Sequence, residues 1–309
     1  MGSLLDEQRA WKGLTPRSKK RFVDLKENGK LEDGRIYDRE GNDVSDYFEV
    51  APKTSGRSNE GYRITRNAGG HDAENGGFTW AFYKTSKSFL DDYTTVKEPD
   101  LARLMFIATF VGFESQQLSH DNGRKIDRAG LQKILGLSAN NFRDFYKRMI
   151  ATEILKENDE GVIELTPFLF HRGKAVRGKS AETSRIKVYR KTIRELYENY
   201  SGRAAKKLSI VYMVLPFLNL KTNIVCFNPD ETDTERLNKM HLDKLAALLD
   251  YKDSNKLRQT LESVKLKGKP VFWLPPDPND KRKKIVVVNP NVVFGGPAKE
   301  LDSIKVLFK

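Results

Sequence analysis

The chain has 309 residues, of which 38% are hydrophobic and 31% charged, and this predicts a soluble protein with room for two domains that need neither disulfides nor metals. No run approaches the roughly 18 to 20 apolar residues that cross a bilayer, and the N-terminus lacks a signal peptide's long apolar stretch, so we expect a cytoplasmic protein with no membrane partner. The net charge of +13 lies entirely in the C-terminal part: residues 1–77 hold 14 basic and 14 acidic residues, residues 78–173 hold 13 of each, and residues 174–309 hold 28 and 15.

This uneven charge is the pattern expected of a region that binds a polyanion, because each neutralised phosphate releases condensed counterions. A solvated basic surface has the same composition, so charge alone does not decide between the two interpretations.

Residues 1–77 predict a charged, flexible N-terminal segment with little structure of its own. A basic cluster spans residues 17–21, and apolar positions are sparse over the first 50 residues. Residues 51–77 then carry six glycines among serine, asparagine and charged residues, a composition typical of linkers.

Residues 78–173 predict a first domain. Residues 79–93 give an amphipathic opening, and residues 101–111 are so apolar that we expect a buried helix, which Pro99 would begin. A short strand pair is expected around the Asn122-Gly123 turn.

The next segment has the pattern of a helix-turn-helix. Asp127 is a good N-cap for a helix over residues 128–135, and Ser138 can cap a second helix over residues 139–152. Gly136 suits the tight turn between them. A hairpin, or wing, is expected to follow, with strands at residues 154–155 and 162–165.

Residues 186–296 predict a second domain on the same plan, after a basic linker at 174–185 and before a C-terminal tail at 297–309. Its expected elements are an opening at 186–200, a helix at 204–217, a strand at 224–227, a helix at 241–249, a helix capped by Ser254, and wing strands at 271–274 and 285–288. The predicted fold class is therefore mainly α with small β wings (α+β), built from two tandem winged helix-turn-helix domains.

A short motif supports a domain duplication. Leu165-Thr166-Pro167 precedes Gly173 with the same spacing by which Val288-Asn289-Pro290 precedes Gly296. The period is too long for a solenoid repeat, so it indicates two copies of one domain.

The second helix of a helix-turn-helix enters the major groove of DNA, where its outward residues near the N-terminus read base edges. Asparagine and glutamine can pair with adenine and arginine with guanine. The alternative is that polar residues lie on any exposed helix face. The candidate base-reading residues are Asn140, Asn141, Arg143 and Lys147 in the first domain and Asn255, Lys256, Arg258 and Gln259 in the second.

The two wing tips differ in charge. The second tip carries four consecutive cations, Lys281, Arg282, Lys283 and Lys284, where a winged helix meets the phosphate backbone. The first tip, at residues 158–160, is acidic. We therefore expect the second domain to be the stronger DNA binder and the first to bind weakly or to contact protein.

The linker supplies three further candidate backbone contacts, Lys174, Arg177 and Lys179, with glycine at regular intervals. This segment is expected either to lie along a DNA groove or to be a solvated linker, and the sequence does not favour one over the other.

The sequence offers no catalytic constellation. The four histidines are far apart and have no partner at metal-ligand spacing, and no nucleotide-binding motif is present. The lone Cys226 lies in an apolar run and is interpreted as a buried hydrophobe and not as a nucleophile. We therefore expect no metal, no cofactor and no enzymatic activity.

The pattern from Phe78 to Gly173, and again from Ile186 to Gly296, resembles the tandem winged-helix proteins of phages and plasmids of Gram-positive bacteria. The resemblance implies sequence-specific binding of double-stranded DNA, as a monomer or homodimer, with replication or transcription proteins as further partners. It favours a phage or plasmid replication initiator over a phage transcription regulator that binds operators. A third hypothesis, from another class, is an interaction scaffold or host-factor inhibitor.

Overall fold

The computed structural model describes residues 15–32, 35–45, 69–82, 95–173 and 185–308. The chain divides into two units, residues 1–62 and residues 63–309. The expected boundary at residue 77 is therefore wrong, because residues 69–77 belong to the larger unit.

The smaller unit contains a helix and a hairpin. Helix α2 (Pro16–Asn28) begins at Thr15, whose Oγ1 accepts a hydrogen bond from the backbone N–H of Ser18. Strands β1 (Lys30–Glu32) and β2 (Arg35–Tyr37) pair antiparallel beside it. The expectation of little structure before Phe78 is therefore wrong, because an N-cap and a proline in the first turn favour a helix where apolar residues are few.

A four-stranded antiparallel sheet lies at the centre of the larger unit, in the order β12-β7-β3-β6. Its strands are β3 (Phe78–Phe82), β6 (Phe170–His171), β7 (Arg185–Tyr189) and β12 (Val293–Phe294). Both expected amphipathic openings thus begin as strands, and the first continues into residues outside the described part. We call residues 78–173 repeat 1 and residues 185–296 repeat 2.

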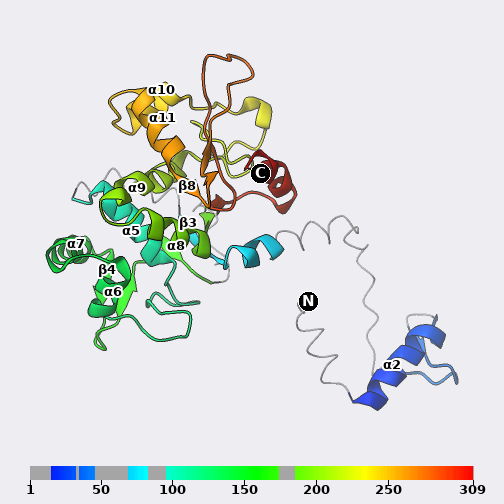
Figure 1. Ribbon diagram of the computed structural model, residues 1–309. Coiled ribbons are helices and arrows are strands. Elements are labelled where there is room, and N and C mark those ends of the chain that lie inside the picture. The colour runs from blue at the N-terminus through cyan, green and yellow to red at the C-terminus, as the bar shows by residue number, and fades with distance from the viewer. Residues whose placement is uncertain (1–14, 33–34, 46–68, 83–94, 174–184, 309) are drawn as a thin grey trace. The chain divides into compact units, whose positions relative to one another are not determined.

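The two repeats share one hydrophobic core and are not separate domains. Helices α5 (Glu98–Ala108) and α9 (Ala205–Met213) pack against each other, and α8 (Arg190–Asn199) lies beside α5. In Figure 1 these three helices and β3 lie in the middle of the larger unit. A single cluster of buried residues runs from Ala81 to Val293. The structure therefore corrects the expected division into 78–173, 174–185 and 186–296.

Repeat 2 reproduces the backbone pairing of repeat 1. Three backbone hydrogen bonds of repeat 1 have counterparts in repeat 2. The bond from Leu118 N–H to Ile163 O (2.8 Å) matches that from Val225 N–H to Val286 O (2.9 Å), and the bond from Ser119 N–H to Phe110 O (2.8 Å) matches that from Cys226 N–H to Phe217 O (2.7 Å). The bond from Thr166 N–H to Ile154 O (2.9 Å) matches that from Asn289 N–H to Val271 O (2.8 Å). Different residues thus occupy equivalent backbone positions in the two copies, as the Thr-Pro and Asn-Pro motifs predict.

Each repeat carries a helix pair followed by a hairpin. In repeat 1 these are α6 (Arg128–Leu135), α7 (Ala139–Ala151), β4 (Leu155–Glu157) and β5 (Ile163–Leu165), at nearly the expected bounds. In repeat 2 they are α10 (Leu242–Leu248), α11 (Ser254–Ser263), β10 (Phe272–Trp273) and β11 (Val287–Val288). A small extra hairpin, β8 (Lys265–Leu266) and β9 (Lys269–Pro270), separates α11 from β10.

The C-terminal residues are folded, which corrects the expected tail at 297–309. Helix α12 (Leu301–Lys305) and the 3-10 turns η6 (Ala298–Glu300) and η7 (Val306–Phe308) follow β12. Leu301, Ile304 and Phe308 are buried in a cluster with Tyr189 and Phe294. Aromatic residues of the sheet thus provide the apolar surface on which the C-terminus folds.

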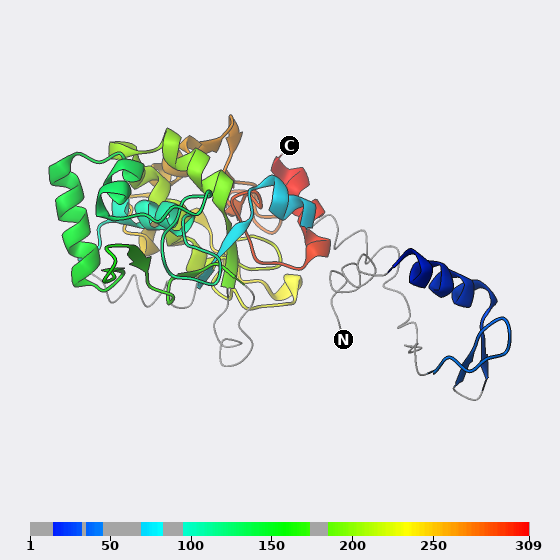
Figure 2. The ribbon, with the colours of Figure 1, turned by 90° about the horizontal axis from the view of Figure 1, so that it is seen from below.

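A helical segment at residues 69–74 lies near these C-terminal residues (Figure 2). Its His71 is buried and lies 3.0 Å from the carbonyl oxygen of Pro290, and burial lowers the pKa of this imidazole. Asp72 accepts hydrogen bonds from Lys187 and from the hydroxyl of Tyr189. These contacts explain why the segment belongs to the larger unit.

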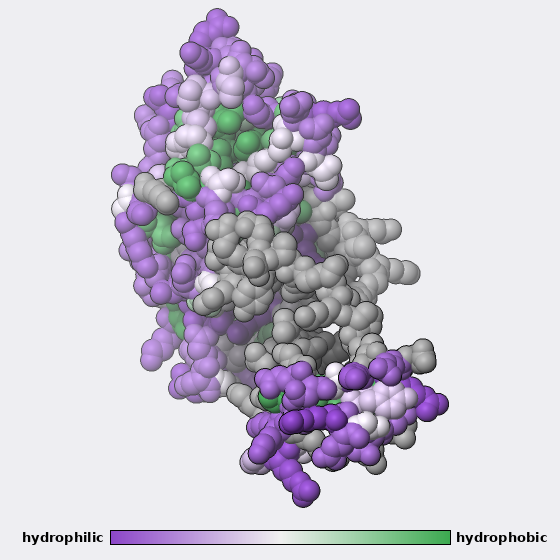
Figure 3. Space-filling model, turned by 90° about the vertical axis from the view of Figure 1, so that its right-hand side faces the viewer, coloured by the Kyte–Doolittle hydropathy of each residue, from purple (hydrophilic) through white to green (hydrophobic). Residues whose placement is uncertain are grey.

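The surface carries most of the charged residues. Figure 3 shows one face on which hydrophilic residues predominate and hydrophobic residues form small groups. Within the described residues, no helix combines the length and the apolar character that a bilayer crossing needs.

Candidate nucleic-acid interface

Helix α7 buries one side and exposes the other. Phe142, Phe145, Tyr146 and Met149 are buried against repeat 1. The four predicted base-reading residues of this helix, Asn140, Asn141, Arg143 and Lys147, are all exposed. The amphipathic spacing therefore places them on the outer face, as expected.

The local sequence fixes the start of α7 relative to α6. Oδ1 of Asp127 accepts a hydrogen bond of 2.7 Å from the N–H of Gly130, and this confirms the expected cap of α6. Gly136 ends α6 with a φ of 61°, a left-handed conformation that glycine adopts without strain. Ser138 occupies the N-cap position of α7, but its side chain makes no capping hydrogen bond.

A buried carboxylate ties the end of α7 to α5. Asp100 is fully buried and receives ion pairs from Arg103 (2.6 Å) and Arg148 (2.9 Å). It also accepts a hydrogen bond of 3.1 Å from the backbone N–H of Lys97. Because Arg148 belongs to α7, this network fixes the helix on the core.

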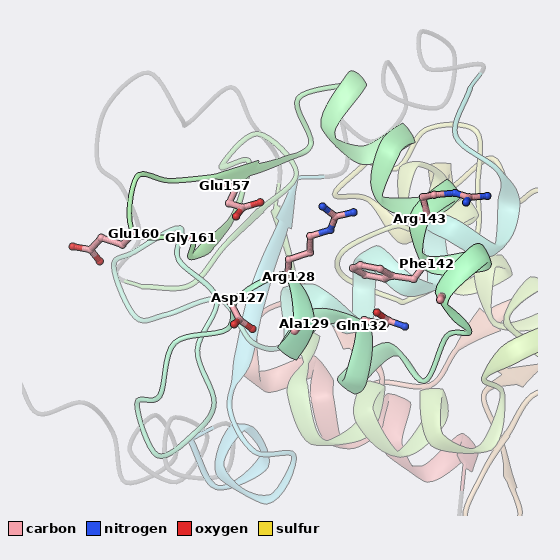
Figure 4. A pocket seen from close by; sticks show the side chains of 10 residues that line it. Asp127, Arg128, Ala129, Gln132, Phe142, Arg143, Glu157, Glu160 and Gly161 are labelled. Atoms are coloured by element: carbon pink, nitrogen blue, oxygen red, sulfur yellow. The ribbon is translucent and has the colours of Figure 1, made fainter.

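A cavity of about 590 Å³ opens between α6, the start of α7 and the first hairpin. In Figure 4 the guanidinium of Arg128 points into the space between Glu157 of the hairpin and Phe142 of α7. This guanidinium lies 4.8 Å from the ring centre of Tyr146, whose hydroxyl donates a hydrogen bond of 2.8 Å to Glu157. Burial, then Glu157, raises the pKa of Tyr146 to about 12, so the hydroxyl keeps its proton.

The charge around this cavity is mixed. Asp127, Glu157 and Glu160 line it together with Arg128 and Arg143. Asp144 forms an ion pair of 3.5 Å with Arg143 on the exposed face of α7. The carboxylates offset the positive charge of Arg128 and Arg143, so this face of repeat 1 is not uniformly basic.

Helix α11 has the same two-sided character. Leu257 and Leu261 are buried. The four predicted base-reading residues, Asn255, Lys256, Arg258 and Gln259, are exposed. The cap differs from the expectation: Asp253, and not Ser254, is the N-cap, and its Oδ1 accepts a hydrogen bond of 2.8 Å from the N–H of Lys256.

The tip of the second hairpin exposes its cations. Lys281, Arg282 and Lys283 are exposed and Lys284 is half-buried. Arg282 bonds to Asp280 at 3.0 Å, yet 90% of its side chain is accessible. The tip therefore presents positive charge to solvent.

A histidine and an aspartate hold this tip against α10. Asp277 is only 4% exposed and lies 2.8 Å from Nε2 of His241, the N-cap residue of α10. The contact with His241 and a hydrogen bond from the N–H of Asn279 lower the pKa of Asp277. Sequence reasoning missed this pair because its members are distant in the chain and share no motif.

Sequence reasoning also missed a second group of exposed cations, on the hairpin β8–β9. The hairpin β8–β9 exposes Lys265, Lys267 and Lys269, and Lys267 pairs with Glu195 at 3.1 Å. The turn of this hairpin contains two residues of positive φ, Lys267 (51°) and Gly268 (81°). The Lys-Gly pair is therefore the sequence signal from which this hairpin could have been predicted. The linker candidates Lys174, Arg177 and Lys179 lie outside the described residues.

The predicted base-reading residues form two separate groups, one on α7 and one on α11. Figure 1 places α6 and α7 on one side of the central helices and α10 and α11 on the other. Among the described residues, no three His, Cys, Asp or Glu side chains are grouped to hold a metal ion.

Comparison with known proteins identifies no related family for this mixed α/β chain. No protein-family model, no curated protein and no solved structure matches it. The geometry of the two repeats is therefore what bears on function.

Proposed function

We propose that this chain is a sequence-specific double-stranded DNA-binding protein built from two winged helix-turn-helix units. One observation carries the proposal: in each repeat the second helix of the pair exposes asparagine and arginine near its N-terminus and is followed by a hairpin. This is the arrangement by which such units read the major groove and touch the backbone.

Repeat 2 supplies most of the electrostatic attraction. The exposed tip cations of the second hairpin and the lysines of β8–β9 belong to the part of the chain that holds the whole net charge. Repeat 1, with its acidic hairpin and mixed-charge cavity, adds less. Two reading units in one chain suit a replication initiator that binds origin DNA as a monomer, which we favour over a transcription regulator.

Salt-dependent binding of a random 30-base-pair duplex tests the proposal. The wild-type chain should bind with an affinity that falls steeply as salt rises, and replacing Lys281, Arg282 and Lys283 with alanine should weaken binding to every sequence and reduce the salt slope by about three. A matched variant replaces three exposed cations on other elements, Arg203, Lys207 and Lys299, and should keep the wild-type slope.

The competing function is a protein-interaction scaffold, which the acidic first hairpin supports. A chain that binds no duplex even at low salt would favour the scaffold and would exclude our proposal. Equal losses in the tip variant and the matched variant would mean that general charge, and not the second hairpin, provides the attraction.

A further inference from the structure

The two repeats are related by a local two-fold axis that passes through the central sheet. β3 and β7 occupy equivalent positions in their repeats. In repeat 1, β3 pairs with β6 (Trp80 opposite His171), and in repeat 2, β7 pairs with β12 (Lys187 opposite Phe294). In the antiparallel pair of β3 and β7, Trp80 is opposite Lys187, so each strand's middle residue faces its counterpart. The flanking pairs keep this symmetry: Phe78 is opposite Tyr189, and Phe82 is opposite Arg185.

The packing above the sheet follows the same axis. The matching helices α5 and α9 lie against each other, and they make the most extensive contact between any two elements of the described chain. The axis therefore relates the helix pair α6–α7 to the helix pair α10–α11. One chain thus has the internal symmetry of a two-fold dimer.

The reading helices match position by position. Counted from the first residue of each helix, Asn140 corresponds to Asn255 and Arg143 to Arg258, while the buried Phe142 corresponds to Leu257. Three other exposed positions differ: Asn141 corresponds to Lys256, Asp144 corresponds to Gln259, and Lys147 corresponds to Glu262. The two helices therefore carry the same polar residue at two of these exposed positions and different residues at three.

We infer that the target of one chain is a single imperfect inverted repeat, whose half-sites agree where the shared asparagine and arginine read and differ at the neighbouring base pairs. This inference rests on the proposed function. Readers related by a two-fold axis approach the two strands of a duplex in opposite directions, so their half-sites are inverted. Asparagine selects adenine and arginine selects guanine, so each half-site contains one adenine and one guanine at matching places.

Selection of bound duplexes from a random library with the full-length chain tests the orientation. The expected result is one motif with two inverted half-sites at a fixed spacing, occupied by a single chain when the mass of the complex is measured. A motif with half-sites in direct orientation, a motif with one half-site, or an inverted motif that holds two chains would each overturn the inference while leaving DNA binding intact. Absence of any bound duplex would instead remove the proposed function.

Exchange of the unlike residues tests the half-sites themselves. A variant with Asn141→Lys and Asp144→Gln gives repeat 1 the exposed residues of repeat 2 at these positions. It should shift the selected motif toward a perfect palindrome, with roughly tenfold discrimination at the exchanged positions. All four positions are exposed, so the exchange leaves the core unchanged. An unchanged motif would mean that α7 does not read bases.

Two single substitutions make a matched pair. Arg143→Ala and Arg258→Ala should each relax the requirement for guanine about tenfold, in opposite half-sites and at symmetric positions. Relaxation by both variants at the same position of the motif would contradict the two-fold arrangement.

Discussion

Nε of Arg148 donates a hydrogen bond of 2.9 Å to Oδ2 of Asp100, and this joins helix α7 to the buried helix α5. Asp100 also pairs with Arg103, so one buried carboxylate balances two guanidinium groups. Asp100→Ala should lower the free energy of unfolding by about 3 kcal/mol, because it leaves these cations without their partner in a partly buried place. Urea denaturation measures the loss.

An exposed carboxylate provides the control for this experiment. Asp159→Ala, at the tip of the first hairpin, should change the free energy of unfolding by less than about 0.5 kcal/mol. A loss of similar size in both variants would show that the buried network does not stabilise α7.

The contact between His241 and Asp277 leads to a prediction about DNA binding. Asp277→Ala should release the tip of the second hairpin from α10, so that the tip cations no longer hold a fixed position. We expect weaker duplex binding with a smaller salt slope. Asp280→Ala should have the opposite effect, because Asp280 pairs with Arg282 and Lys283 and its removal makes these cations more available. Fluorescence anisotropy across a salt series distinguishes these results, and a loss of affinity in both variants would contradict this role of Asp277.

Asp121 predicts a stability change at low pH. Hydrogen bonds from Arg194, and then from Arg190, lower its pKa to about 2 from 3.8. The folded pKa is below the unfolded one, so this carboxylate stabilises the fold above about pH 4, and the contribution is lost as the pH falls toward 2. Because its side chain is 61% exposed, we expect roughly 1 kcal/mol at pH 7 and not the full value that the pKa difference would give.

Chemical denaturation of the wild-type chain and of Asp121→Asn measures this contribution. The variant should be less stable at pH 7, and the two curves should converge between pH 4 and pH 2. A gap of constant size across this range would show that the ion pairs of Asp121 do not contribute.

Gly136 predicts a purely conformational effect. Its φ is 61°, and a Cβ at this position would meet no atom within 4 Å. Gly136→Ala should therefore lower the free energy of unfolding by about 1 kcal/mol through backbone strain alone. Gly136→Asn should cost less, because asparagine tolerates the left-handed region. Equal losses for alanine and asparagine would contradict this explanation.

The local parts of the fold could be predicted because their signals are local. Asp127, Gly136 and the apolar spacing of α6 and α7 gave the bounds of both helices to within a residue. The apolar spacing of α7 and α11 placed all eight candidate base-reading residues on exposed faces. Whether they bind DNA stays a prediction.

The central sheet could not be predicted from the sequence. β3 and β7 are more than a hundred residues apart in the sequence, and the pattern of a five-residue strand does not indicate which other strand it pairs with. The expected independent domains were wrong for this reason, since pairing of these strands merges the two cores. The buried C-terminus was missed because residues 301–308, although apolar at five of eight positions, form only a short segment whose partners are aromatic residues of the distant sheet.

The two-fold axis between Trp80 and Lys187 has a consequence for how such a protein can change over generations. In a homodimer, one codon change alters both reading helices together, so both halves of the DNA target must change in step. Here α7 and α11 have their own codons, and a substitution in α11 leaves α7 as it was. Under the proposed function, new target sequences would therefore be reached through one half-site at a time, while the other half-site keeps the protein bound.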